Sequence, residues 1–93
     1  MKSFDEVWKL IVKHEGQSFK TKRGIPFKYT FSSPQSLVID SSTTDYYYTS
    51  KRSFEIGVEI GKCAGPVTYK GEKISGSSYV WAILHDKRIN SFE

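Results

Sequence analysis

Hydrophobic positions near the N-terminus repeat at the spacing of an α-helix. Ser3, followed three residues later by Glu6, matches a capping box at the start of this segment. Gly16 follows the last turn, where a left-handed C-cap is expected. The pattern predicts a helix that packs one face on a sheet. The apolar residues of that face are Phe4, Val7, Trp8, Ile11 and Val12.

The segment 19–31 alternates at a period of two, which is typical of strands. Lys20, Lys22 and Lys28 fall on one face, and Arg23 lies in an Arg-Gly turn between the two halves. The sequence therefore predicts a β-hairpin with an aromatic side toward the core and a basic side toward solvent. The residues of the inward face are Phe19, Thr21, Phe27, Tyr29 and Phe31.

Two further strands are predicted in the middle of the chain, and the segment after them is ambiguous. Residues 36–40 and 46–48 read as short strands on either side of a polar loop at 41–45. Segment 50–60 alternates like a strand, yet Ser50 is a good N-cap and Phe54 and Val58 form a helical pair. An interior glycine, Gly57, weakens the helix interpretation, so periodicity leaves both open.

The C-terminal third predicts turns and a short helix. Residues 61–66 form a turn region, 67–71 a short extended piece, and 76–86 a helix with Ser77 or Ser78 near its N-cap. We expect one α+β domain over residues 1–93. Its N-terminal helix packs on an antiparallel sheet of three or four strands, with one or two further short helices. The apolar face of the last helix holds Tyr79, Val80, Ile83 and Leu84.

Composition limits the function classes without choosing one. Lys and Arg exceed Asp and Glu by 14 to 10, a modest basic balance that favours anionic partners. The single cysteine, Cys63, allows neither an intrachain disulfide nor a multi-thiolate zinc site. The N-terminus lacks the apolar core of a signal peptide, and no apolar run reaches transmembrane length. We expect a soluble cytoplasmic protein with no membrane partner.

No residue pattern indicates catalysis. His14 and His85 both lie near predicted helix ends, where a structural role suffices. A Gly-x-Ser-x-Gly nucleophile elbow, metal-ligand spacing and a phosphate-binding loop are all missing from the sequence. We therefore expect a protein that is not an enzyme and that uses no metal and no cofactor.

The basic residues favour nucleic-acid binding. A two-stranded ribbon fits the major groove of DNA, and sheet-based docking is a known mode. Lys51 and Arg52 could add phosphate contacts if Ser50 begins a helix. We expect backbone contacts to double-stranded DNA, with DNA favoured over RNA. The residues predicted to make these contacts are Lys20, Lys22, Arg23, Lys28, Lys51 and Arg52.

A protein partner is the alternative. Trp81 falls off the apolar face of the last helix, and an exposed tryptophan is a good interface anchor. Tyr47 is the second candidate for such an interface. Equally, Trp81 could pack under the C-terminal segment 89–92.

Several short motifs lie along the chain from Phe19 onward. They are Phe19-x-Thr21-x-x-Gly24-x-Pro26-Phe27-x-Tyr29, Ser53-Phe54-Glu55, Gly65-Pro66 and Gly76-x-Ser78-Tyr79-Val80-Trp81-Ala82-Ile83-Leu84-x-Asp86-x-Arg88-Ile89. Together they resemble a small domain of bacteria and phages that occurs alone or attached to restriction or mobile-element proteins. The resemblance implies that segment 50–60 is a helix, and that the setting is DNA transactions or phage–host conflict. In that setting, the alternative function is a non-enzymatic protein that binds and modulates a partner, such as a host defence nuclease.

Overall fold

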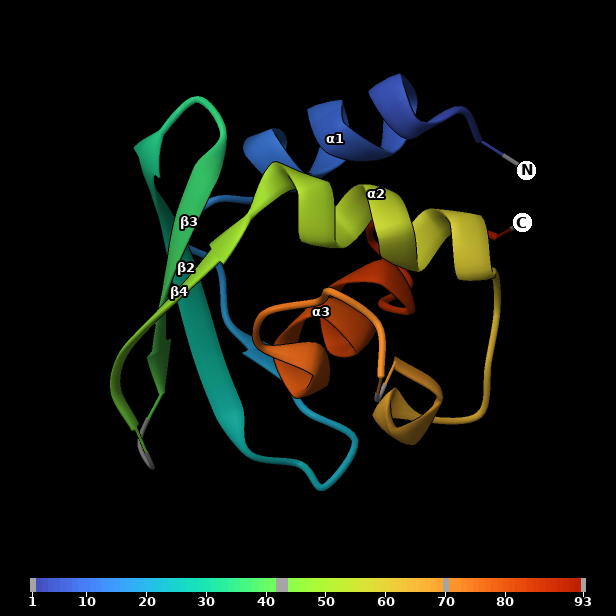
Figure 1. Cartoon of the computed structure of the whole chain (residues 1–93). Helices are drawn as coiled ribbons and strands as arrows, with labels where there is room; N and C mark the ends of the chain where they lie inside the picture. Colours follow the sequence, from blue (N-terminus) through green and yellow to red (C-terminus); the bar gives the residue numbers. More distant parts are fainter. Residues whose placement is uncertain (1, 42–43, 70, 93) are drawn as a thin grey trace.

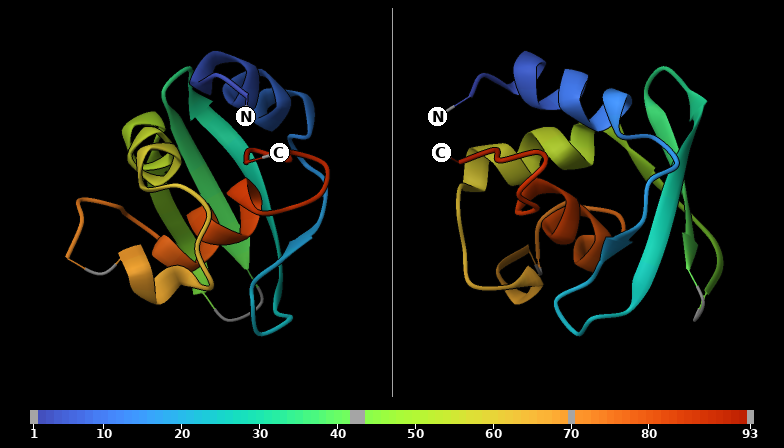
Figure 2. Two further views of the ribbon diagram at one scale, coloured as in Figure 1. Left: turned by 90° about the vertical axis from the view of Figure 1, so that its right-hand side faces the viewer. Right: turned by 180° about the vertical axis from the view of Figure 1, so that it is seen from behind.

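A four-stranded antiparallel sheet carries all three α-helices on one of its faces (Figure 1). The computed structural model describes residues 2–41, 44–69 and 71–92. No described element covers the opposite face of the sheet (Figure 2). This arrangement confirms the predicted α+β fold. The elements are α1 (Phe4–Lys13), β1 (Phe19–Lys20), β2 (Pro26–Ser33), β3 (Ser36–Ser41), β4 (Thr44–Ser50), α2 (Lys51–Ile60), the 3-10 helix η1 (Pro66–Tyr69) and α3 (Ser77–Leu84).

The strands follow one another across the sheet in chain order, so each pairs with its neighbour in sequence. The predicted hairpin is present, but β1 is only two residues long and pairs Phe19 with Phe27. Thr21 leaves the strand, and its carbonyl accepts from the amide of Gly24 at 2.8 Å. Gly24 has a φ of +86°, which explains a glycine in this turn. Of the predicted loop 41–45, residues 42 and 43 lie outside the described residues.

Helix α1 begins at the predicted capping box. The amide of Glu6 donates to the Ser3 hydroxyl, and the Glu6 carboxylate accepts from the Ser3 amide. The helix ends with His14 as its C-cap. Gly16, two residues further on, adopts a φ of +84° and donates its amide to the carbonyl of Tyr29 at 3.0 Å. The turn after α1 is therefore bonded directly to β2.

The ambiguous segment 50–60 is a helix, α2. Ser50 is its N-cap, and the Ser50 hydroxyl accepts from the amide of Ser53. Gly57 lies where α2 meets α3, since a Cβ atom added there would be 2.6 Å from Cδ1 of Leu84. The glycine that weakened the helix interpretation is thus needed for the close approach of two helices.

The prediction of an extended segment at 67–71 is wrong. Residues 66–69 form η1, and the ring of Tyr69 is buried beneath α2 and α3. Helix α3 then begins as predicted near Ser77, with Gly76 as its N-cap at a φ of +68°. No helix within the described residues is long and apolar enough to cross a membrane.

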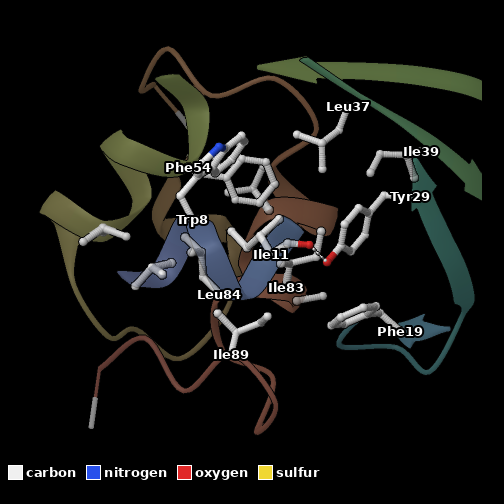
Figure 3. Close-up of a cluster of buried hydrophobic side chains, with 14 of the residues drawn as sticks. Trp8, Ile11, Phe19, Tyr29, Leu37, Ile39, Phe54, Ile83, Leu84 and Ile89 are labelled. Atoms are coloured by element: carbon white, nitrogen blue, oxygen red, sulfur yellow. Dashed lines mark hydrogen bonds between the residues drawn. The ribbon is translucent and has the colours of Figure 1, made fainter. Parts of the chain in front are cut away.

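The core between sheet and helices is strongly aromatic (Figure 3). The Trp8 ring of α1 lies 5.5 Å from Phe31 of β2 and 5.6 Å from Phe54 of α2. The hydroxyl of buried Tyr29 donates to the carbonyl of Ile11 at 2.6 Å, shown by a dashed line in Figure 3. The large rings supply much buried area from few residues, which suits a core of this size.

Candidate functional site

The first of two clefts beside the β1–β2 turn lies between that turn, the start of η1 and the first turn of α3. Its volume is about 790 Å³. Lys22 and Arg23 line it from the turn, and Ser77 and Ser78 line it from α3. In Figure 1 the loop between β1 and β2 runs below α3 and toward η1. Three segments that are distant in sequence thus form one concave surface.

The second cleft lies on the other side of the same turn. It has a volume of about 470 Å³ and is lined by Lys20, by Trp81 and His85 of α3, and by residues 86–88. Helix α3 therefore borders both clefts, with its first turn in one and its later turns in the other. We call the residues that line the two clefts the hairpin–α3 surface.

The hairpin–α3 surface carries the whole net charge of the chain. Asp86 is the one acidic residue among its lining residues. Removing the surface's five basic residues from 14, and its one acidic residue from ten, leaves nine of each sign elsewhere in the sequence. The excess of four positive charges is therefore local. The five basic residues are Lys20, Lys22, Arg23, Lys87 and Arg88.

Lys22 fixes the position of the turn relative to the loop before η1. Its Nζ donates to the carbonyl of Ala64 at 2.7 Å and lies 5.9 Å from the centre of the Trp81 ring. The side chain passes over Gly65, where an added Cβ would come within 2.8 Å of that Nζ. This contact holds the ammonium group at the boundary of the two clefts.

Trp81 is half-buried and held on two sides. Its Nε1 donates to the carbonyl of Cys63 at 3.1 Å, and its ring stacks on His85 at 4.5 Å with an interplanar angle of 17°. His85 in turn contacts the ring of Phe92 at 4.8 Å. Trp81 is thus linked through His85 to Phe92. This arrangement is close to the second possibility from the sequence, in which Trp81 packs under segment 89–92.

His85 uses both ring nitrogens. Nε2 accepts from the Cys63 amide at 3.2 Å, so Nδ1 carries the proton and donates to the Trp81 carbonyl at 2.9 Å. Burial lowers the pKa of His85, although its hydrogen bond to the Trp81 backbone acts in the opposite direction. His85 is accordingly neutral at pH 7, and its hydrogen bond with the Cys63 amide connects the end of α3 to the loop before η1.

Arg88 and Asp86 form an ion pair that neutralises both charges. Nε of Arg88 lies 2.9 Å from Oδ1 of Asp86. Burial by itself would raise the pKa of Asp86, but hydrogen bonds from Arg88 lower it overall. The guanidinium also lies 3.9 Å from the centre of the Phe19 ring and donates to the carbonyl of Ser18. Arg88 therefore connects the segment after α3 to β1 and the residue before it.

Four cations of the hairpin–α3 surface remain without an ion pair within the described residues. Lys20, Arg23 and Lys87 are exposed, and Lys22 is bonded only to a neutral carbonyl. Because neither an acidic partner nor burial offsets these charges, they are available to an anionic ligand. Helix α3 adds to the positive potential, since no side chain caps its N-terminus beside the first cleft.

Lys28 lies apart from the clefts. It is exposed on the uncovered face of the sheet, and its Cα partner on β3 is Asp40. The two residues line a small depression together. A carboxylate opposite the lysine reduces the positive potential of that face.

The structure does not bring Lys51 and Arg52 to the hairpin turn. The amide of Lys51 donates to the carbonyl of Gln35, beyond the far end of β2. Strand β2 has eight residues, so its two ends are separated by about 25 Å. The guanidinium of Arg52 pairs with Glu55, and Nζ of Lys51 lies 5.5 Å from the Trp8 ring.

Tyr47 is a partly exposed residue of β4, with 40% of its surface accessible. Its ring lies 6.2 Å from that of Tyr79, which lines the first cleft. Tyr47 therefore packs near a residue that lines the first cleft. Tyr47 itself lines neither cleft, whereas Trp81 lines the second.

Sequence patterns missed the contribution of α3 and of the segment after it. Lys87 follows the predicted last helix directly, but only the packing of α3 beside β1 places it near Lys20. The sequence predicts Ser77 and Ser78 only as N-cap residues of the last helix. No group of three or more His, Cys, Asp or Glu side chains in the described ranges could hold a metal ion.

Comparison with protein-family models, with curated proteins and with solved structures gives no significant match. The geometry and charge of the hairpin–α3 surface are therefore the basis on which a function can be proposed.

Proposed function

We propose that this protein binds nucleic acid, with double-stranded DNA as the expected ligand, through phosphate contacts made by the hairpin–α3 surface. One observation carries the proposal: the residues that line the two clefts account for the whole positive excess of the chain. A DNA backbone presents a dense row of negative charges, and lysines that displace its counterions gain affinity.

The proposed contacts are made to the backbone and do not read bases. Lys20, Lys22 and Lys87 carry compact point charges that suit phosphate oxygens, and Arg23 can bind one bidentately. Contacts of this kind position a protein on DNA with little dependence on sequence. Lys28 lies on the uncovered face of the sheet, and Lys51 and Arg52 lie near the far end of β2, so these three residues are not part of the proposed surface.

A charge-reversal experiment tests the proposal. The variant Lys20→Glu/Arg23→Glu reverses two exposed charges of the surface, and Lys9→Glu/Lys13→Glu makes the same net change on the exposed side of α1. Binding of each to a fluorescent duplex is measured by anisotropy over a range of salt concentrations. We expect the first variant to bind more weakly and to lower the salt slope by about two, because two phosphate contacts are lost.

The control variant should keep the wild-type slope while circular dichroism confirms that both variants fold. Equal losses in the two variants would contradict a localised surface. A wild-type protein that fails to bind duplex DNA even at low salt would contradict the proposal and favour the alternative of a protein partner.

A further inference from the structure

We propose that the first cleft receives one unpaired nucleotide of the bound nucleic acid, with its phosphate at Lys22 and Arg23 and its base against the apolar lining residues. This inference rests on the proposed function and adds a preferred substrate class: duplex DNA that carries an unpaired nucleotide.

The size of the cleft fits a small ligand. Its volume of about 790 Å³ lies within the range of about 300–1,000 Å³ that is typical of small-molecule sites. The cleft is bordered by the β1–β2 turn, η1 and α3, so residues of three segments surround it. A single base with its sugar and phosphate is a ligand of this class.

Four of the lining residues, here called the apolar wall, contribute apolar surface to the cleft. Val67 has 66% of its surface accessible and lies beside Pro66, and Ile25 contributes from the turn. Tyr79 completes this wall, and its ring is held by Phe27 at 5.0 Å in an edge-on contact. Exposed apolar surface within a charged cleft suits the face of a nucleobase, which stacks on apolar and aromatic side chains.

The remaining lining residues are complementary in charge to one phosphate. Lys22 and Arg23 are among them, and no acidic side chain lines this cleft in the part of the chain that the structure describes. Nζ of Lys22 is fixed by its 2.7 Å bond to the Ala64 carbonyl. Ser77 and Ser78 also line the cleft, and serine hydroxyls can donate to phosphate or sugar oxygens. An anion with a flat apolar group attached matches both parts of the lining at once.

A fully paired duplex cannot fill the apolar wall, because its bases are stacked inside the helix. Entry of a base requires that it be unpaired or turned out of the stack, and an unpaired base needs the least unstacking energy. The phosphate contacts of the hairpin–α3 surface would then hold the flanking duplex. This separates two effects: charge sets the general affinity, and the cleft sets a preference for an unpaired base.

The test compares two duplexes that differ only in one bulged position. One carries a single bulged nucleotide, and the other carries an abasic residue at the same bulge, so the backbone charge is matched. We expect the wild-type protein to bind the nucleotide bulge about tenfold more tightly, since stacking of one base on a protein commonly contributes this much.

Two variants locate the effect. Val67→Glu replaces an apolar side chain of the apolar wall by a carboxylate. We expect this variant to lose the preference for the nucleotide bulge, because the stacking surface is lost and the carboxylate repels the DNA strand. Val12→Glu makes the same change at a second exposed valine, on α1, with 47% of its surface accessible. This control should retain the tenfold preference.

The outcomes separate the inference from the function on which it rests. Binding to both bulged duplexes with equal affinity would overturn the inference and leave DNA binding intact. A preference that survives Val67→Glu would overturn its location in this cleft. Failure to bind any of these DNAs at low salt would overturn the proposed function, and the inference with it.

Discussion

Tyr29 shows how a polar group is accommodated inside an aromatic core. Its ring is fully buried, and its hydroxyl bonds to the carbonyl of Ile11. That carbonyl lacks the usual helical partner, because the amide of Glu15 donates to Val12 instead. Burial raises the pKa of Tyr29, so the hydroxyl remains a donor at any ordinary pH. The Tyr29 hydroxyl thus supplies a hydrogen bond to the carbonyl left unpaired in the last turn of α1, and it connects that turn to β2.

Two tyrosine-to-phenylalanine variants test this role. Tyr29→Phe leaves the Ile11 carbonyl buried without a partner, so the free energy of unfolding should fall by about 1–3 kcal/mol. Tyr69 is the control, because its buried hydroxyl has no nitrogen or oxygen partner within the described residues and is near only the weakly bonding thiol of Cys63. Tyr69→Phe should therefore change the stability by much less. Equal losses in urea denaturation would contradict the account of Tyr29.

His85 should make stability depend on pH. Burial lowers its pKa in the folded protein below the usual value of about 6.5. Below about pH 6.5 the unfolded chain binds a proton that the folded chain resists, so the stability falls as the pH drops toward the folded pKa. Above about pH 7.5 the histidine is mostly neutral in both states and this effect vanishes.

The measurement is the urea midpoint at about pH 7.5 and about pH 5.5 for the wild type, His85→Gln and His14→Gln. We expect the wild type and His14→Gln to lose stability between these values. His85→Gln should lose markedly less. A pH dependence that persists unchanged in His85→Gln would assign it to other groups.

Among the elements, those that depend on local signals could be predicted from the sequence. The capping box of α1, the alternation of β2 and the β-branched residues of β3 are sufficient, because caps, apolar periodicity and strand propensity act within one segment. The 3-10 helix η1 was missed because one short turn carries no periodic signal. Segment 50–60 was left open because Gly57 has a tertiary role that local propensity cannot reveal.

That role of Gly57 can be tested directly. In Gly57→Val the new side chain would collide with Leu84 and Tyr69 where α2 meets α3. We expect a loss of about 2 kcal/mol or more in the free energy of unfolding, because this part of the core is already filled. Glu59→Val, on the exposed side of the same helix, should stay within about 0.5 kcal/mol of the wild type. Similar stabilities for the two variants would show that the helices can move apart.

At the scale of the whole molecule, the hairpin–α3 surface has a net charge of +4, and the charges of all other residues sum to zero. Lys20, Lys22 and Arg23 could be predicted as a group because they are neighbours in one hairpin. Lys87 could not, since it reaches this surface only through the packing of α3 beside β1. The sequence predicts Lys51 as part of the same surface as the hairpin lysines, yet the length of β2 separates them. Sequence proximity identifies three of the five basic residues of the surface, and tertiary structure adds Lys87 and Arg88.

The most direct test of a localised nucleic-acid surface is an NMR titration of the isotope-labelled protein with a short DNA duplex. We predict that the amide shifts concentrate in residues 20–25 and 77–88, which border the two clefts. Amides on the exposed side of α1 and in α2 should change little. Shifts centred on Lys51 and Arg52, or no shifts at low salt, would contradict the assignment of DNA binding to the hairpin–α3 surface.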